Sequence, residues 1–323
     1  MPANEQDDIG QRPGGNLDAP IPVTIVGGYL GAGKTTLVNH VLRHADGMRI
    51  AVLVNELGDL AIDADLIVAR DGDMVAVAGG CVCCSYGSDL MAALMDLAQR
   101  QPRFDHVVLE VSGVALPRPV AASVSLLPAY TNDGIVVLVD ATAVRRLAAD
   151  RYLADTIDLQ LAAADIVILN KIDLVDGASR DQLLAWLQEK APGARAIPTV
   201  NAALPVDVIT AARLGRTRPA SGFTLPRHMA DIYHTEVIEF PGVVDPHALG
   251  QALAAPELGL LRAKGIVAGP GETTWTIQVV ASRCDVIQRP MLPRGVGRIV
   301  CIGLKHQIDM ARLLELPARW LQA

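Results

Sequence analysis

The sequence contains few lysines and cysteines and no long hydrophobic run. Its five lysines are Lys34, Lys171, Lys190, Lys264 and Lys305. A net charge of -7 over 323 residues leaves no broad positive field to attract nucleic acid. No apolar run approaches the roughly 20 residues that cross a bilayer, and the polar start lacks the features of a signal peptide. We therefore expect a cytoplasmic protein with no nucleic-acid or membrane partner, whose surface positive charge comes mainly from arginine.

What is abundant is hydrophobic sequence, at 51% of the residues, which is enough for one large core and a smaller second module. Strand-like apolar runs alternate with helix-like segments. The runs are Val23–Val26, Ile50–Val54, His106–Val111, Ile135–Val139, Ile166–Leu169 and Ala196–Val200. This alternation predicts an α/β fold with a doubly wound, mostly parallel sheet, in which ligands bind at the carboxyl ends of the strands.

Composition divides the chain into four parts. We expect a disordered tail over residues 1–19, a large α/β domain over 20–214, a linker rich in Gly, Pro and Arg over 215–232, and a smaller α+β domain over 233–323. In the last part, strands are expected at Thr235–Phe240, Thr273–Val280 and Arg298–Gly303. Helices are expected there at Pro246–Ala254 and His306–Leu314.

Residues 28–35 match the G-x-x-x-x-G-K-[ST] pattern of a phosphate-binding loop. The loop follows an apolar run and opens a helical pattern, so its N–H groups and the positive end of the helix form a nest for phosphates. Lys34 is expected to reach the β and γ phosphates and Thr35 to bind Mg²⁺. The residues expected to contact the nucleotide here are Gly28, Gly31, Ala32, Gly33, Lys34, Thr35 and Thr36.

Residues 170–173 form the N-K-x-D pattern that is typical of guanine recognition. The Asp173 carboxylate can accept hydrogen bonds from the guanine N1–H and 2-amino groups, whereas adenine offers neither donor and would leave the carboxylate unpaired. Asn170 is expected to position the base and its loop, and the Lys171 stem to cover the ring. The pattern therefore favours GTP over ATP. The alternative is a capping turn in which Asp173 begins a helix.

Two carboxylates follow strand-like runs at the same edge of the expected sheet. Glu110 ends one run and Glu56 follows another, so we expect one to bind Mg²⁺ and the other to orient the attacking water. The sequence alone does not decide which glutamate has which role. Our prediction places Glu110 at Mg²⁺. The Gly113 N–H is expected to face the γ phosphate. Surface salt bridges are the alternative for each glutamate.

Three of the five cysteines, Cys81, Cys83 and Cys84, form a C-x-C-C cluster. Thiolates at this density favour Zn²⁺, whose tetrahedral shell needs a fourth ligand, such as Glu56, a water or a client residue. Small buried side chains and a thiol redox switch are the alternatives. Cys284 and Cys301 lie in apolar sequence and are expected in the core.

Taken together, residues 27–36, 55–58, 80–84, 110–113 and 170–173 resemble the CobW-type metallochaperone GTPases in motif and in order. The resemblance covers roughly Pro22–Val200 and, more patchily, the C-terminal domain around Leu261–Gly265. It implies a P-loop GTPase of low intrinsic rate that binds Zn²⁺, or sometimes Co²⁺, through Cys81, Cys83, Cys84 and Glu56.

The resemblance also implies a client metalloprotein, to which GTP hydrolysis delivers the metal. A homodimer that depends on nucleotide or metal is left open. The competing hypothesis is a redox-responsive GTPase switch, in which the cysteine cluster senses oxidants and the C-terminal domain recruits a protein partner. A third hypothesis is a kinase that uses GTP on a small substrate.

Overall fold

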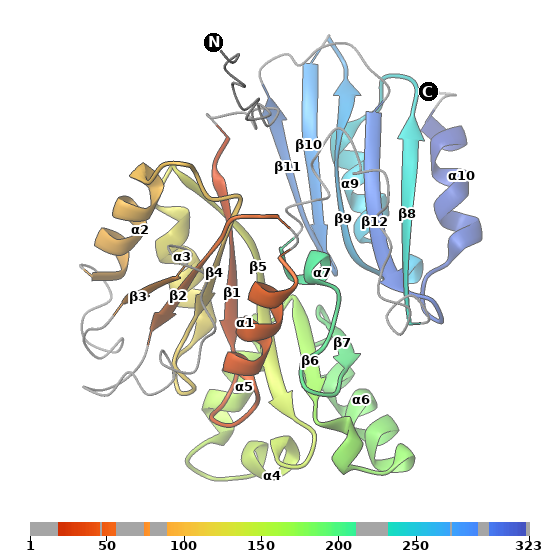
Figure 1. Cartoon of the computed structure of the whole chain (residues 1–323). Coiled ribbons are helices and arrows are strands. Elements are labelled where there is room, and N and C mark those ends of the chain that lie inside the picture. The colour runs from red at the N-terminus through yellow and green to blue at the C-terminus, as the bar shows by residue number, and fades with distance from the viewer. Residues whose placement is uncertain are drawn as a thin grey trace, which may run out of the picture.

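The computed structural model describes residues 19–45, 47–55, 74–77, 89–210, 232–271, 273–289 and 297–320. They form two sheets of different kind (Figure 1). The first has seven parallel strands in the order β3-β2-β4-β1-β5-β6-β7. Its strands are β1 (Ile21–Gly27), β2 (Ile50–Asn55), β3 (Met74–Val77), β4 (His106–Glu110), β5 (Tyr130–Asp140), β6 (Ile166–Asn170) and β7 (Arg195–Pro198).

Strand β1 lies between β4 and β5. After β1 the chain forms β2, β3 and β4 on one side of it and then β5, β6 and β7 on the other side. Such a reversal of strand order opens a crevice at the carboxyl ends of the strands. The strands are rich in Val and Ile because both faces of the sheet are buried in apolar cores. The prediction of a doubly wound parallel sheet is confirmed.

Helices cover the two faces of this sheet unequally. One face packs against α2 (Asp89–Gln99), α3 (Pro117–Ser125), α4 (Val144–Ala148), α5 (Ala154–Ala163) and α6 (Gly177–Lys190). The other face packs against α1 (Lys34–Arg43) and α7 (Val206–Thr210). The core on that second face also contains residues of the C-terminal part, namely Tyr233, Leu261, Val280, Ile302 and Leu304.

The second sheet has five antiparallel strands in the order β11-β10-β9-β12-β8. They are β8 (Tyr233–Phe240), β9 (Leu260–Gly269), β10 (Thr273–Val280), β11 (Arg283–Arg289) and β12 (Gly297–Leu304). Helices α9 (Pro246–Ala254) and α10 (Met310–Trp320) contribute to its core. The expected α+β character is present, but strands β9 and β11 were not predicted, and α10 begins at Met310 rather than His306.

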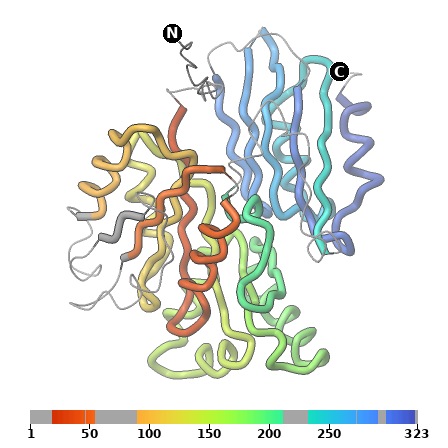
Figure 2. Tube along the Cα trace, viewed as in Figure 1, coloured from red at the N-terminus to blue at the C-terminus, as the bar shows by residue number. Residues whose placement is uncertain are grey.

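The two sheets meet through a buried contact at α7 and the amino-terminal ends of the parallel strands (Figures 1 and 2). Arg262 of β9 is fully buried there, and its guanidinium donates to carbonyls of α7 and to Asp133 near the start of β5. The expectation that arginines serve the surface is therefore wrong for Arg262, because Asp133 and the end of α7 supply acceptors inside the protein.

The predicted domain boundary and most of the predicted linker fall within residues 211–231, outside the described residues. Within the described ranges, no helix combines the length and apolar character needed to cross a membrane.

Candidate functional site

The phosphate loop joins β1 to α1, and its shape depends on three glycines. Gly28, Gly31 and Gly33 have φ angles of +128°, +78° and +105°, which residues with a side chain rarely adopt. A Cβ on Gly28 would lie 2.2 Å from the Leu138 carbonyl oxygen. A Cβ on Gly31 would meet no atom within 4 Å, so the loop borders open space at Gly31.

Helix α1 begins directly at Lys34, and its first turn carries no acidic side chain. No side chain caps this helix start either, so the positive end of the helix dipole faces the loop and favours an anion there. Lys34 is 8% exposed, Thr35 is half-buried and Thr36 is exposed. The predicted phosphate-binding residues thus lie together at the amino end of α1.

Glu110 is the last residue of β4, in register with Val26 of β1, two residues before the phosphate loop begins at Gly28. The glutamate is buried, at 4% exposure. Gly113 is also buried, and a Cβ there would lie 2.9 Å from the backbone nitrogen of Leu30 and 2.6 Å from Leu30 Cδ2. The structure therefore brings Glu110 and Gly113 beside the phosphate loop.

Asn170, at the end of β6, connects the phosphate loop to the loop after β7. Its Nδ2 donates to the Ala32 carbonyl at 3.0 Å, and its Oδ1 accepts from the Ala202 backbone N–H at 2.9 Å and from Thr199 Oγ1 at 3.3 Å. A Cβ on Gly33 would lie 2.5 Å from the same Nδ2. Because the amide is committed to these partners, Asn170 positions two loops relative to each other.

Lys171 has a left-handed backbone, with φ of 63°, and its Nζ lies 2.6 Å from Asp140 Oδ2 at the end of β5. Burial alone would raise the pKa of the Asp140 carboxyl, but hydrogen bonds from Lys171 and Thr142 lower it below the ordinary value. Asp140 is therefore charged at neutral pH and holds the Lys171 side chain in place.

Asp173 lies in the short 3-10 helix Ile172–Leu174 and is exposed. Helix α6 is capped instead by Asp176, whose side chain accepts a hydrogen bond from the Ser179 backbone N–H at 2.7 Å. The capping alternative for Asp173 is therefore wrong. Its exposed carboxylate is accessible to a ligand at the same edge of the sheet as Asn170.

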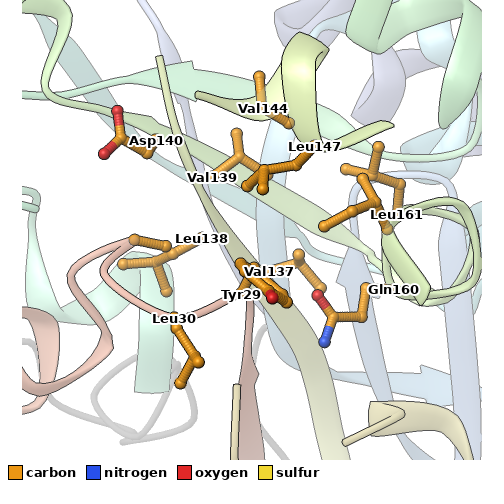
Figure 3. A pocket seen from close by; sticks show the side chains of 12 residues that line it. Tyr29, Leu30, Val137, Leu138, Val139, Asp140, Val144, Leu147, Gln160 and Leu161 are labelled. Carbon is orange, nitrogen blue, oxygen red and sulfur yellow. The ribbon is translucent and has the colours of Figure 1, made fainter. Parts of the chain in front are cut away.

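Sequence reasoning missed two polar residues near this edge, Asp140 and Gln160. Asp140 directly follows the predicted strand Ile135–Val139, which is a signal that was available. Gln160 lies within α5 and has no such signal. Figure 3 shows Tyr29 and Leu30 of the phosphate loop and Gln160 and Leu161 of α5 around a small, mostly apolar cavity.

The predicted metal residues Glu56, Cys81, Cys83 and Cys84 lie outside the described residues. In the part of the chain that the structure describes, no group of three or more His, Cys, Asp or Glu side chains is arranged to hold a metal ion. Cys301 is buried as expected, while Cys284 is only half-buried. Burial raises the pKa of Cys284 to about 11 and that of Cys301 further, so neither is a reactive thiolate at neutral pH.

These residues fit a nucleoside triphosphate with Mg²⁺. A loop with three glycines at positive φ leads into an uncapped helix start, which is the arrangement that binds phosphates through backbone N–H groups, and Lys34 provides a positive charge. Thr35 and Glu110 provide the hydroxyl and carboxylate oxygens that Mg²⁺ prefers.

Comparisons with known proteins match both parts of the chain. Residues 22–198 match the family described as "CobW/HypB/UreG, nucleotide-binding domain", and residues 233–316 match "Cobalamin synthesis protein cobW C-terminal domain". The "Zinc chaperone CobW" of Sinorhizobium sp. is 31% identical, over 90% of this chain and 94% of that one.

Two further similarities cover different extents of the chain. "Zinc-regulated GTPase metalloprotein activator 1" of Schizosaccharomyces pombe is 37% identical, over 48% of this chain and 40% of that one. The crystal structure of the Zn(II)-bound YjiA GTPase from E. coli is 23% identical, with a TM-score of 0.44, and covers 94% of this chain and 99% of that one.

Proposed function

Because the chain belongs to the CobW/HypB/UreG family of nucleotide-binding proteins and is a GTPase, we propose that it uses GTP hydrolysis to deliver zinc to a client metalloprotein. GTP, Mg²⁺ and Zn²⁺ are the ligands that the family and the site imply. The observation that carries the proposal is the convergence of the phosphate loop, Glu110 and Asn170 on one edge of the sheet, in a chain whose two domains both match this family.

The chain's own groups supply positioning and charge neutralisation, which are the main needs of phosphoryl transfer. The N–H groups of the loop cradle the phosphates, and Lys34 neutralises charge that develops between the β and γ phosphates. Thr35 and Glu110 would hold Mg²⁺, and Glu56 would orient the attacking water. When bound, Mg²⁺ neutralises charge on the β and γ oxygens.

Guanine recognition falls to the segment after β6. In this proposal Asp173 accepts two hydrogen bonds from the base. The contacts of Asn170 with Ala32 and Ala202 support this role, because they hold the base loop against the phosphate loop. The ion pair between Lys171 and Asp140 fixes the lysine stem beside the ring.

Zinc is the cargo, bound by Cys81, Cys83 and Cys84 with Glu56 as a fourth ligand. The position of Glu56 in the sequence supports coupling. It lies one residue after the end of β2, and β2 pairs with β4, which ends at Glu110. A residue that serves both the metal and the nucleotide would change its contacts when the γ phosphate leaves, so hydrolysis would favour release of zinc to the client.

We expect the reduced protein to bind about one Zn²⁺ per chain, as one tetrahedral thiolate site requires. The Cys83→Ser/Cys84→Ser variant should bind none, while Cys284→Ser, outside the motif, should bind as wild type. Metal analysis after dialysis measures both. Wild-type protein that holds no metal but forms a reversible disulfide would contradict the proposal and support the redox-switch hypothesis instead.

A further inference from the structure

Gln160 of α5 is a buried amide that bridges to the loop after β4. Its side chain is 1% exposed, and Nε2 donates to the Gly113 carbonyl at 3.1 Å and to the Ala115 carbonyl at 2.9 Å. The two acceptors lie more than 40 residues earlier in the chain. One side-chain nitrogen therefore ties α5 to two carbonyls of the turn that follows β4.

This turn is pressed against the phosphate loop. The Val111 N–H donates to the Val26 carbonyl at 2.9 Å, which extends the pairing of β4 with β1, and the Ala115 N–H closes the turn on the Ser112 carbonyl at 2.9 Å. Gly113 lies between Val111 and Ala115, and a side chain at this position would collide with Leu30. A shift of the turn would therefore move Gly113 relative to the phosphates.

The buried residues of α5 beside Gln160 offer no side-chain donor that could make these hydrogen bonds in its place. Its buried neighbours on α5, Ile157 and Leu161, are apolar and line a cavity together with Tyr29 and Leu30. Figure 3 shows Leu161, Gln160, Tyr29 and Leu30 around this cavity. Without the Gln160 amide, the carbonyls of Gly113 and Ala115 would lose the donor that the structure gives them. Buried carbonyls without donors are costly, so the turn would move to recover hydrogen bonds.

We propose that Gln160 is a positioning residue for recognition of the γ phosphate. It holds Gly113 so that the N–H of this residue meets the terminal phosphate of GTP, a group that GDP lacks. The inference rests on the proposed function and on the expectation from the sequence that the Gly113 N–H faces the γ phosphate of GTP. It concerns the ratio of affinities for GTP and GDP, and zinc and the client play no part in it.

The test is nucleotide binding by Gln160→Met, which keeps the volume of the side chain and removes both donated hydrogen bonds. Affinity for a non-hydrolysable GTP analogue should fall about tenfold, as the loss of one hydrogen bond to a charged group implies, while affinity for GDP stays as in wild type. The turnover number for GTP should fall as well. The matched control is Gln188→Met on α6, an exposed glutamine that donates to the Pro192 carbonyl at 3.3 Å, which should change neither affinity.

A purely structural role for Gln160 would lower thermal stability and weaken both nucleotides alike, and an equal loss for GTP analogue and GDP overturns the proposal. Unchanged affinities overturn it too. If the variant does not fold, hydrogen exchange of the wild type decides. The GTP analogue should protect the amides of residues 113–115 and of α5 more than GDP does, and equal protection contradicts the proposal. Wild-type protein that binds neither nucleotide would refute the proposed function itself.

Discussion

Replacing Arg262 with methionine should lower the free energy of unfolding by about 3–5 kcal/mol, the usual cost of removing one partner of a buried ion pair. The guanidinium is fully buried, and Nη2 contacts both the carboxylate and the carbonyl of Asp133. Its Nη1 donates to the carbonyls of Val208 and Ile209 at 2.8 and 2.9 Å. Burial raises the pKa of Asp133, and the positive charge of Arg262 opposes that rise more than those of Lys264 and Arg283 do, so loss of Arg262 removes the main partner of the carboxylate.

Neighbouring groups reinforce the same contact. Thr24 Oγ1 donates to the Ile209 carbonyl at 2.6 Å, so it accepts from His106 Nε2 at 2.9 Å. Burial, with the charges of Arg262 and Lys264, holds the pKa of His106 well below its usual value, so the ring is neutral. The end of α7 is thus held jointly by β1 and β9, and loss of Arg262 should loosen the contact between the two domains.

Urea unfolding at neutral pH measures this effect, with Arg298→Met as the matched control. Arg298 pairs with Glu239 on the surface of the same sheet, so its loss should cost less than about 1 kcal/mol. The double variant Arg262→Met/Asp133→Asn should recover part of the loss, because the buried charge that has lost its hydrogen-bonded partner is then removed as well. Equal losses for Arg262→Met and Arg298→Met would show that the buried pair does not stabilise the domain contact.

Replacing Lys34 with alanine should reduce the turnover number for GTP by about 10²–10³, as loss of a preorganised group that neutralises transition-state charge does in other enzymes. Lys34 is the first residue of α1, directly after the phosphate loop, and is 8% exposed. No other lysine or arginine lies in residues 28–36 to replace it.

Phosphate release under saturating GTP measures the effect. Lys190→Ala is the control, since Lys190 of α6 pairs with Asp158 of α5 at 2.8 Å, and this variant should hydrolyse GTP as wild type does. Both variants should keep the circular dichroism of wild type. Hydrolysis by Lys34→Ala at the wild-type rate would contradict the proposed role of Lys34 in neutralising charge on the phosphates.

The parallel sheet was predictable because its strands are short apolar runs and its polar motifs follow them directly. This is why the phosphate loop, Glu110 and Asn170 could be expected at one edge from their positions in the chain alone. The partners of Asn170 could not, since Ala32 and Ala202 meet it only through the fold. Gln160 was hidden for the same reason, because its acceptors belong to a loop distant in sequence.

The C-terminal sheet was harder to predict because some of its strands carry charged residues. Strand β9 places Arg262 and Lys264 two residues apart, and β11 contains Arg283, Asp285 and Arg289, so neither segment shows a continuous apolar pattern. The charges of β9 are satisfied by the first domain, where Asp133 lies near both. The contact of Arg262 and Lys264 with Asp133 cannot be predicted from the sequence pattern of a single strand.

The central claim is that the nucleotide and the metal influence each other, and titration calorimetry tests it most directly. Zn²⁺ should change the affinity for a non-hydrolysable GTP analogue, and the analogue should change the affinity for Zn²⁺ by the same factor, as thermodynamic linkage requires. The Cys83→Ser/Cys84→Ser variant should bind the analogue with one affinity whether or not Zn²⁺ is present. Identical affinities of the wild type with and without Zn²⁺ would contradict the account.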